Sequence, residues 1–317
     1  MEAVVGSLAT GILATADKLI NLIEELRQMQ FLTKKILSDH QILVAAVLEF
    51  DADIASENDR FCSPVDKAQF DALFTERYGA NGERLFWRAT NSKCTPLHQV
   101  EMLSNSLDRI VNAQRRDPKR DWVSNAMNPA ATLLEDHGWR ISQFEPRSGL
   151  LCEYSTSPFE SNWAVQAIYD RERLDPNNNK PGEPHISCLL AHDVPMTGKY
   201  KDCVPRGELL SILRLMVERA LDTTWQDCAV LPVFVYSFSA DYVRITQAHF
   251  DGKRLQLRRT EPVSIVGSNW QETVKMLLRW ILAQPRLPAQ QKALVVPRIR
   301  TSKSNASLDS RADSFVH

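Results

Sequence analysis

The chain has 317 residues, of which 44% are hydrophobic and 24% are charged, and this composition is typical of a globular protein. Its 38 lysines and arginines nearly balance its 39 aspartates and glutamates, so a net charge of -1 gives no overall attraction to nucleic acid or to an anionic membrane. These values argue against nucleic acid as a partner, and the length leaves room for two domains.

The opening segment, MEAVVGSLATGILATADKLINLIEELRQ, has the pattern of an amphipathic helix. Its apolar residues recur at alternating spacings of three and four, which places them on one helical seam. The seam consists of Val5, Leu8, Ile12, Leu19, Leu22, Leu26 and Met29. The basic start of a signal peptide is missing, and Asp17 and Lys18 interrupt the uncharged run before it is long enough to span a membrane. We therefore expect a cytoplasmic protein, with the nucleus as the alternative.

Residues 1–115 as a whole predict a helical bundle. Apolar residues between 36 and 54 continue a helical face, either as a second helix or as the second half of one kinked helix. Ser63, followed by proline, is typical of the N-cap of a further helix, which is expected to end at Gly79. Another helix is predicted to begin at Pro96.

The second half of the chain differs from the first in composition and in the periodicity of its apolar residues. Residues 116–128 have mixed charge, prolines and no periodicity, which is typical of a linker. Residues 129–285 then predict an α+β domain with a mixed sheet and two packing helices, one opening at Pro205 and one over 270–282. Residues 286–317 are rich in serine and aperiodic, which predicts a disordered tail. The expected fold class is therefore α+β, with a helical bundle preceding the mixed-sheet domain.

The clearest local signal is a β-hairpin in the segment DYVRITQAHFDGKRLQLRR. Two strand-like runs flank Asp251 and Gly252, a dipeptide that accepts the positive φ angles of a two-residue turn. This turn places Thr246 opposite Leu257 on an apolar face and leaves polar and basic side chains on the other face.

Positive charge is concentrated on this hairpin. The basic patch consists of Arg244, His249, Arg254 and Arg258, with Lys253 and Arg259 beside them. Such a patch suits phosphate contacts, but a solvated sheet face that protects an edge from aggregation explains it as well. We favour the solvated face, because the whole chain carries no net positive charge.

The sequence contains none of the common catalytic or nucleotide-binding motifs. Asp241 followed by Asp251-x-Lys253 matches the loose spacing of magnesium-dependent nucleases, in which two acids hold the metal and a lysine steadies charge. However, Asp251 is better explained as a turn residue, and a turn tip is a poor place for a sheltered metal site. We lean towards a protein without catalytic activity.

Zinc-type side chains occur close together in one other segment. They are His185, Cys188, His192, Asp193 and Cys203. They lack the closely spaced pairs of a structural zinc site, and the two histidines fall on opposite faces if the segment is one strand. We expect a buried thiol among surface histidines, and we expect neither a metal nor a cofactor. The six scattered cysteines are expected to be reduced.

Two resemblances suggest a biological setting. The opening segment resembles the N-terminal helix of the fungal HeLo-like domains that precede STAND-type nucleotide-binding receptors. That resemblance implies a helical bundle used in self-association and, in some members, in membrane-targeted cell death, although no P-loop domain follows here. Residues 125–285 are similar to a region common in uncharacterised proteins of filamentous fungi, which carries no assigned activity.

These observations favour a non-catalytic interaction or self-association module with a signalling, cell-death-like or regulatory role. Val5, Leu8, Ile12 and Leu19 are the candidate interaction residues, and the expected partner is another protein or a second copy of the chain. The alternative is a divergent magnesium-dependent nuclease or an accessory enzyme of a fungal specialised (secondary-metabolite) pathway. Contact of the N-terminal helix with a membrane is a further alternative.

Overall fold

A nine-stranded mixed sheet organises the fold in the computed structural model of the protein. The structure describes residues 17–26, 29, 31–44, 48–50, 61–79, 96–113, 132–142, 151–154, 162–171, 184–222, 225, 228, 230–250 and 254–285. The strand order is β2 (Ile42–Val44), β11 (Leu255–Arg259), β10 (Tyr242–Phe250), β9 (Val233–Ser239), β7 (Ile186–His192), β6 (Trp163–Arg171) and β4 (Trp139–Ile141). Two short strands, β12 (Val263–Ser264) and β5 (Cys152–Glu153), pair with β10 and β6. The predicted α+β class is confirmed.

Two strand pairs in this sheet are parallel, and the others are antiparallel. β7 is parallel to β9, and helix α7 (Arg206–Leu221) lies between them in the chain as the crossover that a parallel pair requires. β2 is parallel to β11 at the sheet edge. Two-stranded ladders join β1 (Phe31–Leu32) to β8 (Val204–Pro205) and β3 (Cys62–Ser63) to β13 (Gln284–Pro285).

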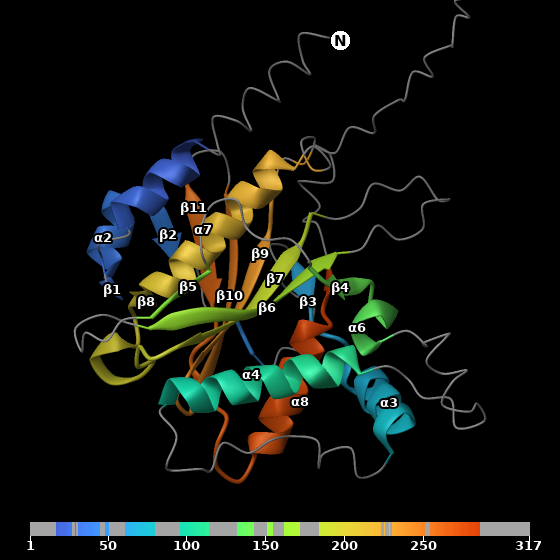
Figure 1. Cartoon of the computed structure of the whole chain (residues 1–317). Helices are drawn as coiled ribbons and strands as arrows, with labels where there is room; N and C mark the ends of the chain where they lie inside the picture. Colours follow the sequence, from blue (N-terminus) through green and yellow to red (C-terminus); the bar gives the residue numbers. More distant parts are fainter. Residues whose placement is uncertain are drawn as a thin grey trace, which may run out of the picture.

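Helix α7 covers one face of the sheet and is itself covered (Figure 1). Its residues are buried over nearly the whole length, since the sheet lies on one side and the helical residues 17–26 pack on it as well. The shared core includes Leu19, Ile23 and Leu26 together with Leu209 and Leu213 of α7. The expectation that the helix after Pro205 packs across a sheet is confirmed.

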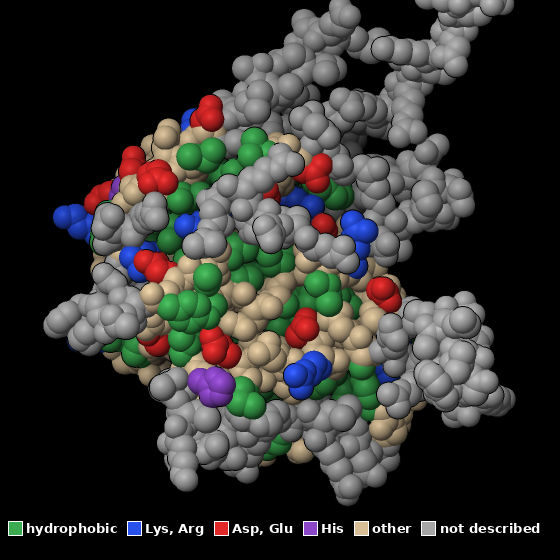
Figure 2. Space-filling view, viewed as in Figure 1, with side chains coloured by type: hydrophobic (Ala, Val, Ile, Leu, Met, Phe, Trp, Pro, Cys, Tyr) green, Lys and Arg blue, Asp and Glu red, His purple; other side chains and the backbone are tan. Residues whose placement is uncertain are grey.

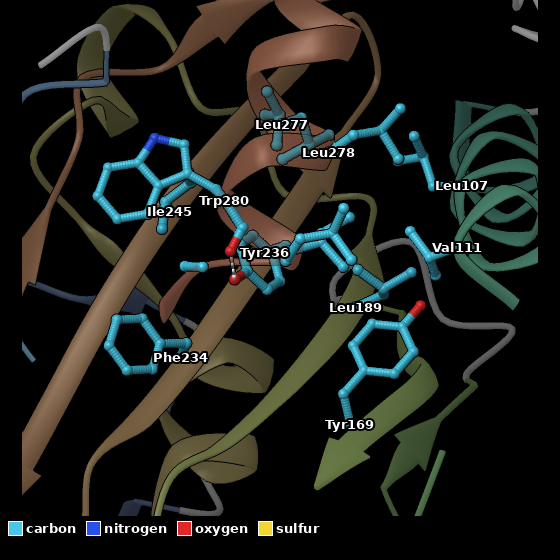
Figure 3. Close-up of a cluster of buried hydrophobic side chains, with 14 of the residues drawn as sticks. Leu107, Val111, Tyr169, Leu189, Phe234, Tyr236, Ile245, Leu277, Leu278 and Trp280 are labelled. Atoms are coloured by element: carbon cyan, nitrogen blue, oxygen red, sulfur yellow. Dashed lines mark hydrogen bonds between the residues drawn. The ribbon is translucent and has the colours of Figure 1, made fainter. Parts of the chain in front are cut away.

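The opposite face carries the second core (Figure 3). Four helices contribute to it, namely α3 (Lys67–Tyr78), α4 (Pro96–Asn112), α6 (Leu133–Asp136) and α8 (Trp270–Ile281). Tyr236 donates a 2.6 Å hydrogen bond to the carbonyl of Trp280, and Trp280 Nε1 donates to the carbonyl of Phe50 at 2.9 Å. These bonds connect the sheet, α8 and the N-terminal part of the chain.

The N-terminal residues do not form a bundle of helices alone. Helix α2 (Lys34–Asp39) is short, and residues 42–44 form strand β2 instead of continuing the helical face predicted between 36 and 54. Gln41 has a φ of 58°, a left-handed conformation that ends the helix and turns the chain. Ile42 is then buried beside β11, so pairing with a distant strand outweighs the local helical pattern.

The start of α3 also differs from the prediction. Asp66 is the N-cap, because its carboxylate accepts the backbone N–H of Gln69 at 3.0 Å. Ser63, the predicted cap, lies in β3 and pairs with Gln284. The expected end at Gly79 is confirmed, and there a φ of 72° is the conformation that glycine accepts most easily.

The hairpin exists, but its register differs by two residues from the prediction. Thr246 pairs with Arg259 and not with Leu257, which pairs with Ala248. The connection therefore has four residues, from 251 to 254, instead of a two-residue turn. A shift of two leaves each side chain on its predicted face, and it places Leu255 and Leu257 in the core under α7.

Several predictions fall outside the described residues. They concern the linker over 116–128, the tail over 286–317 and the seam residues Val5, Leu8 and Ile12. In the part of the chain that the structure describes, no helix combines the length and the apolar character needed to cross a membrane.

Candidate functional site

Polar side chains gather on the sheet face beneath the N-terminal half of α7. His192 of β7, Ser237 of β9, and Arg244 and Thr246 of β10 point to this face, and Glu208 of α7 faces them. Each of these residues is at most 1% exposed. Such a cluster in a core needs internal partners, and its hydrogen bonds decide what chemistry it supports.

Ser237 and His192 form a hydrogen bond like that of a catalytic dyad, but the histidine donates to the serine instead of accepting its proton. Ser237 Oγ lies 2.9 Å from His192 Nε2, while His192 Nδ1 accepts the backbone N–H of Val194 at 3.2 Å. The neutral ring therefore carries its proton on Nε2 and donates it to the serine. Burial, assisted by the charge of Arg244, lowers the pKa of His192 to about 3. The pair is thus suited to structural support and not to activating the serine.

Glu208 supplies the negative charge of this cluster. Thr246 Oγ1 donates a hydrogen bond to Glu208 Oε1, and Oε2 has no hydrogen-bond partner among the described residues. Burial lowers the pKa of Arg244, and the charge of Glu208 opposes this effect. Glu208 therefore acts as the internal counter-charge that keeps a buried arginine protonated.

Arg244 and Arg259 lie side by side where this cluster reaches the surface. Arg244 donates to the carbonyls of Lys201 at 2.8 Å and Cys203 at 3.4 Å. Arg259 donates to the carbonyls of Cys203 at 2.9 Å and Asp202 at 3.2 Å. The turn that follows Gly198–Tyr200 therefore fixes both guanidinium groups through main-chain oxygens.

These arginines line a cavity of about 360 Å³ between α2, β2 and the end of β11, which we call the arginine cavity. In Figure 1, α2, β2 and β11 lie together at one edge of the sheet. Its charged lining consists of Lys34, Lys201, Asp202, Arg244, Arg259 and Glu261. Its apolar wall consists of Leu37, Ile42, Leu43, Val44 and Pro262. A fixed charged group beside an apolar wall is the usual composition of a binding pocket.

The predicted basic patch is not a single surface. Arg244 faces α7, whereas His249 lies on the opposite sheet face, where it is 8% exposed and its ring is 4.6 Å from that of Phe61. Arg254 is exposed and Arg258 is half-buried. The expectation of one solvated basic face is therefore wrong for Arg244 and His249. On the face drawn in Figure 2, lysine and arginine side chains are scattered among acidic ones.

The nuclease-like pair of acids lies only partly within the described residues. Asp241 precedes β10, and Asp251 follows its last residue, Phe250. A strand rises by about 3.3 Å per residue, so the length of β10 places roughly 26 Å between its ends. The two described ends of β10 are therefore too far apart for one metal ion to contact both. Asp251 and Lys253 themselves lie outside the described residues.

The zinc-type side chains are also kept apart. His185 and His192 lie on opposite sheet faces, as predicted, but both are completely buried, so the prediction of surface histidines is wrong. Cys188 is buried as expected, and burial raises the pKa of its thiol. Within the described ranges, no three His, Cys, Asp or Glu side chains are placed to hold a metal ion together.

Leu19 is the only one of the predicted interaction residues that the structure describes. It is 1% exposed and packs in the core shared with α7, so its side chain is part of the hydrophobic core of its own chain. Glu208 and Thr246 were not among the residues predicted for a site, and Arg259 was named only beside the basic patch. The period-two alternation of a strand groups Arg244 with Thr246, but the approach of α7 carries no local sequence signal.

Comparison with known proteins gives no match to any family model, curated protein or solved structure.

Proposed function

We propose that the chain is a non-catalytic binding module and that the arginine cavity is its ligand site. The observation that supports this proposal is the pair Arg244 and Arg259, fixed by main-chain carbonyls next to an apolar wall. Side chains held in place in this way lose little conformational freedom when a ligand binds.

The chemistry of the lining favours binding over catalysis. A guanidinium group stays protonated in proteins, so neither arginine suits a role as general acid or base. The nearby Ser237 and His192 form a pair with the wrong proton arrangement for nucleophilic attack. The two arginines and the neighbouring serine–histidine pair therefore support recognition by charge and shape, and none of these four side chains is set up to transfer a proton or attack a substrate.

Self-association, which the resemblance to HeLo-like domains implies, is constrained by the packing of residues 17–26. Leu19, Ile23 and Leu26 are buried against α7, so a second copy that used this seam would have to withdraw them from the core. We therefore place the binding role at the arginine cavity and not at this part of the seam.

A thermal-unfolding experiment on the full chain tests the binding proposal. The ligands are phenyl phosphate, benzoate, benzamide and benzylamine, which share one ring and differ in charge. We expect at least one of them to raise the Tm of the wild type, since a ligand that binds the native state stabilises it. Ser38→Trp, at an exposed position of α2 that lines the cavity, should fill the cavity and abolish the rise.

Met102→Trp is the matched control, because Met102 is 39% exposed and lies on α4, away from the cavity. This variant should keep the wild-type response. The proposal is wrong if no ligand changes the Tm, or if Ser38→Trp and the wild type respond equally. The proposal that the module is non-catalytic is tested by chromatography of the ligand after incubation with the wild type. Conversion of the ligand into a product would contradict that proposal.

A further inference from the structure

We infer that the arginine cavity binds a ligand with an oxyanion head, a carboxylate or a phosphate, and an apolar body, and that Glu261 competes internally for the head position. This inference rests on the proposed function, because it specifies the ligand of the same site.

The first argument is an excess of hydrogen-bond donors. A guanidinium group carries five N–H bonds. Arg244 and Arg259 each donate two hydrogen bonds to main-chain carbonyls, which leaves three N–H bonds on each without an acceptor among the described residues. The Nε–H of both side chains is buried away from the cavity, so the donors considered for a ligand are the terminal guanidinium nitrogens. Carboxylate and phosphate oxygens are the acceptors that paired guanidinium groups bind most strongly.

The second argument is electrostatic. The positive charge of Arg259 lowers the pKa of Arg244, which means that the two guanidinium groups repel each other. Lys34 and Lys201 add positive charge to the same lining, against the carboxylates of Asp202 and Glu261. Glu208 accepts a hydrogen bond from Thr246, and its charge also acts on Arg244. A bound anion would therefore relieve a repulsion that the free protein retains, whereas a cation would increase it.

Glu261 occupies the position from which it can substitute for such an anion. Its Oε2 lies 2.9 Å from Lys201 Nζ, and it also raises the pKa of Arg244 through its charge. The side chains of Lys201 and Glu261 are 53% and 56% exposed, so their pair is weak and opens readily. A ligand oxyanion of higher affinity would take over Lys201 and displace the Glu261 side chain into solvent.

The apolar wall requires a body as well as a head. Val44 and Pro262 are half-buried and present aliphatic surface to the cavity, next to the buried side chains of Leu37 and Ile42. Inorganic phosphate would leave this surface in water, whereas a ring or an alkyl chain attached to the oxyanion would cover it. Phenyl phosphate and benzoate are therefore suitable probes, and comparison of their affinities distinguishes a phosphate from a carboxylate head.

Isothermal titration of the full chain tests the inference. We expect phenyl phosphate or benzoate to bind the wild type with a Kd at least about tenfold below that of benzamide, benzylamine or inorganic phosphate. Glu261→Gln should lower the Kd of the anionic probe by about two- to fivefold, because it removes the competitor. Arg259→Gln should raise it by about tenfold or more.

Glu272→Gln is the matched control for Glu261→Gln. Glu272 is 57% exposed and pairs with Lys67 and Lys275, away from the arginine cavity, so its substitution should leave the Kd unchanged. If Arg259→Gln does not fold, the ionic-strength dependence of the wild type replaces it, since the affinity for an anion should fall as salt rises.

The outcomes separate this inference from the proposed function. If benzamide or benzylamine binds as tightly as the anions, and Ser38→Trp blocks it, the binding module stands and the oxyanion inference is wrong. Equal Kd values for Glu261→Gln and the wild type would overturn the competition by Glu261 alone. Inorganic phosphate as tight as phenyl phosphate would overturn the need for an apolar body. If no probe binds, both proposals fail.

Discussion

His185 and His192 lie on opposite faces of the sheet, and both are held in the neutral form by burial. His185 Nε2 lies 2.9 Å from the carbonyl of Phe61, and its ring stacks on Phe234 with 6.3 Å between the ring centroids. Burial lowers the pKa of each histidine to about 3, with further lowering by nearby arginines. At a pH between these values and the ordinary histidine pKa of 6.5, both rings are neutral in the folded state and protonated in the unfolded state.

The first prediction at this scale concerns stability against pH. Below about pH 6.5 the unfolded chain protonates both histidines, whereas the folded chain does not do so until pH about 3. The unfolded state therefore binds more protons in this window, and stability falls as the pH falls. Each histidine should cost about 2 kcal/mol of the free energy of unfolding between pH 7 and pH 5.

Urea unfolding of the wild type, His192→Gln and His98→Gln at these two pH values measures the effect. His192→Gln should lose about 2 kcal/mol of the pH dependence whatever its stability at pH 7, while His98→Gln, whose side chain is 55% exposed, should retain it. An unchanged pH dependence in His192→Gln would show that this ring is not the group that titrates.

At the scale of elements, α7 is the helix around which the first core is built. It crosses between β7 and β9, and it packs on the sheet with one side and on residues 17–26 with another. This arrangement explains why α7 is apolar over most of its circumference, since little of it meets solvent. It also places Glu208 opposite the polar side chains of Arg244 and Thr246 on the sheet.

The packing of residues 17–26 on α7 gives the prediction for this scale. Ile23 is 4% exposed and Ile20 is 40% exposed in the same helical segment. Ile23→Ala should reduce the free energy of unfolding by about 2–4 kcal/mol, because it opens a space in the core. Ile20→Ala should change it by less than about 0.5 kcal/mol. Chemical unfolding measures both, and equal effects would place this segment away from α7.

The elements that were predicted correctly are those with a long local pattern. The helices at 96–112, 206–221 and 270–281 each repeat apolar residues over three or more turns, and the hairpin has alternation on both sides of a turn signal. Strand β2 has three residues, so its pattern fits a helix equally well. Its strand conformation depends on pairing with β11, some two hundred residues away, which no local window contains.

The arginine cavity was only partly predictable for the same reason. Arg244 was identified as one of the basic hairpin residues, and the strand alternation places it on the face of Thr246. In the structure Arg259 pairs with Thr246, on the same face as Arg244, and the two-residue change in register does not alter that face. The carbonyls that fix both guanidinium groups come from residues 201–203, and the apolar wall comes from α2 and β2. Four separate segments therefore meet at a site that no short motif describes.

At the scale of the whole molecule, the N-terminal residues are joined to the rest by backbone pairing as well as by side chains. β2 pairs with β11, β3 pairs with β13, and Phe50 accepts a hydrogen bond from Trp280. The helical residues 17–26 and helix α4 complete the cores on the two faces of the sheet. Removal of these segments would expose the apolar side chains of both cores to water.

The final prediction is therefore that residues 116–317 do not fold alone. Without residues 1–115, α7 loses the cover of Leu19, Ile23 and Leu26, and β11 becomes an open edge strand. The fragment should bind a dye for exposed apolar surface and unfold without a cooperative transition, whereas the full chain should unfold in one transition by both fluorescence and circular dichroism. Addition of residues 1–115 as a separate chain should restore cooperativity, because the lost pairing is non-covalent. A cooperative transition of the fragment by itself would instead support two domains divided at residues 116–128.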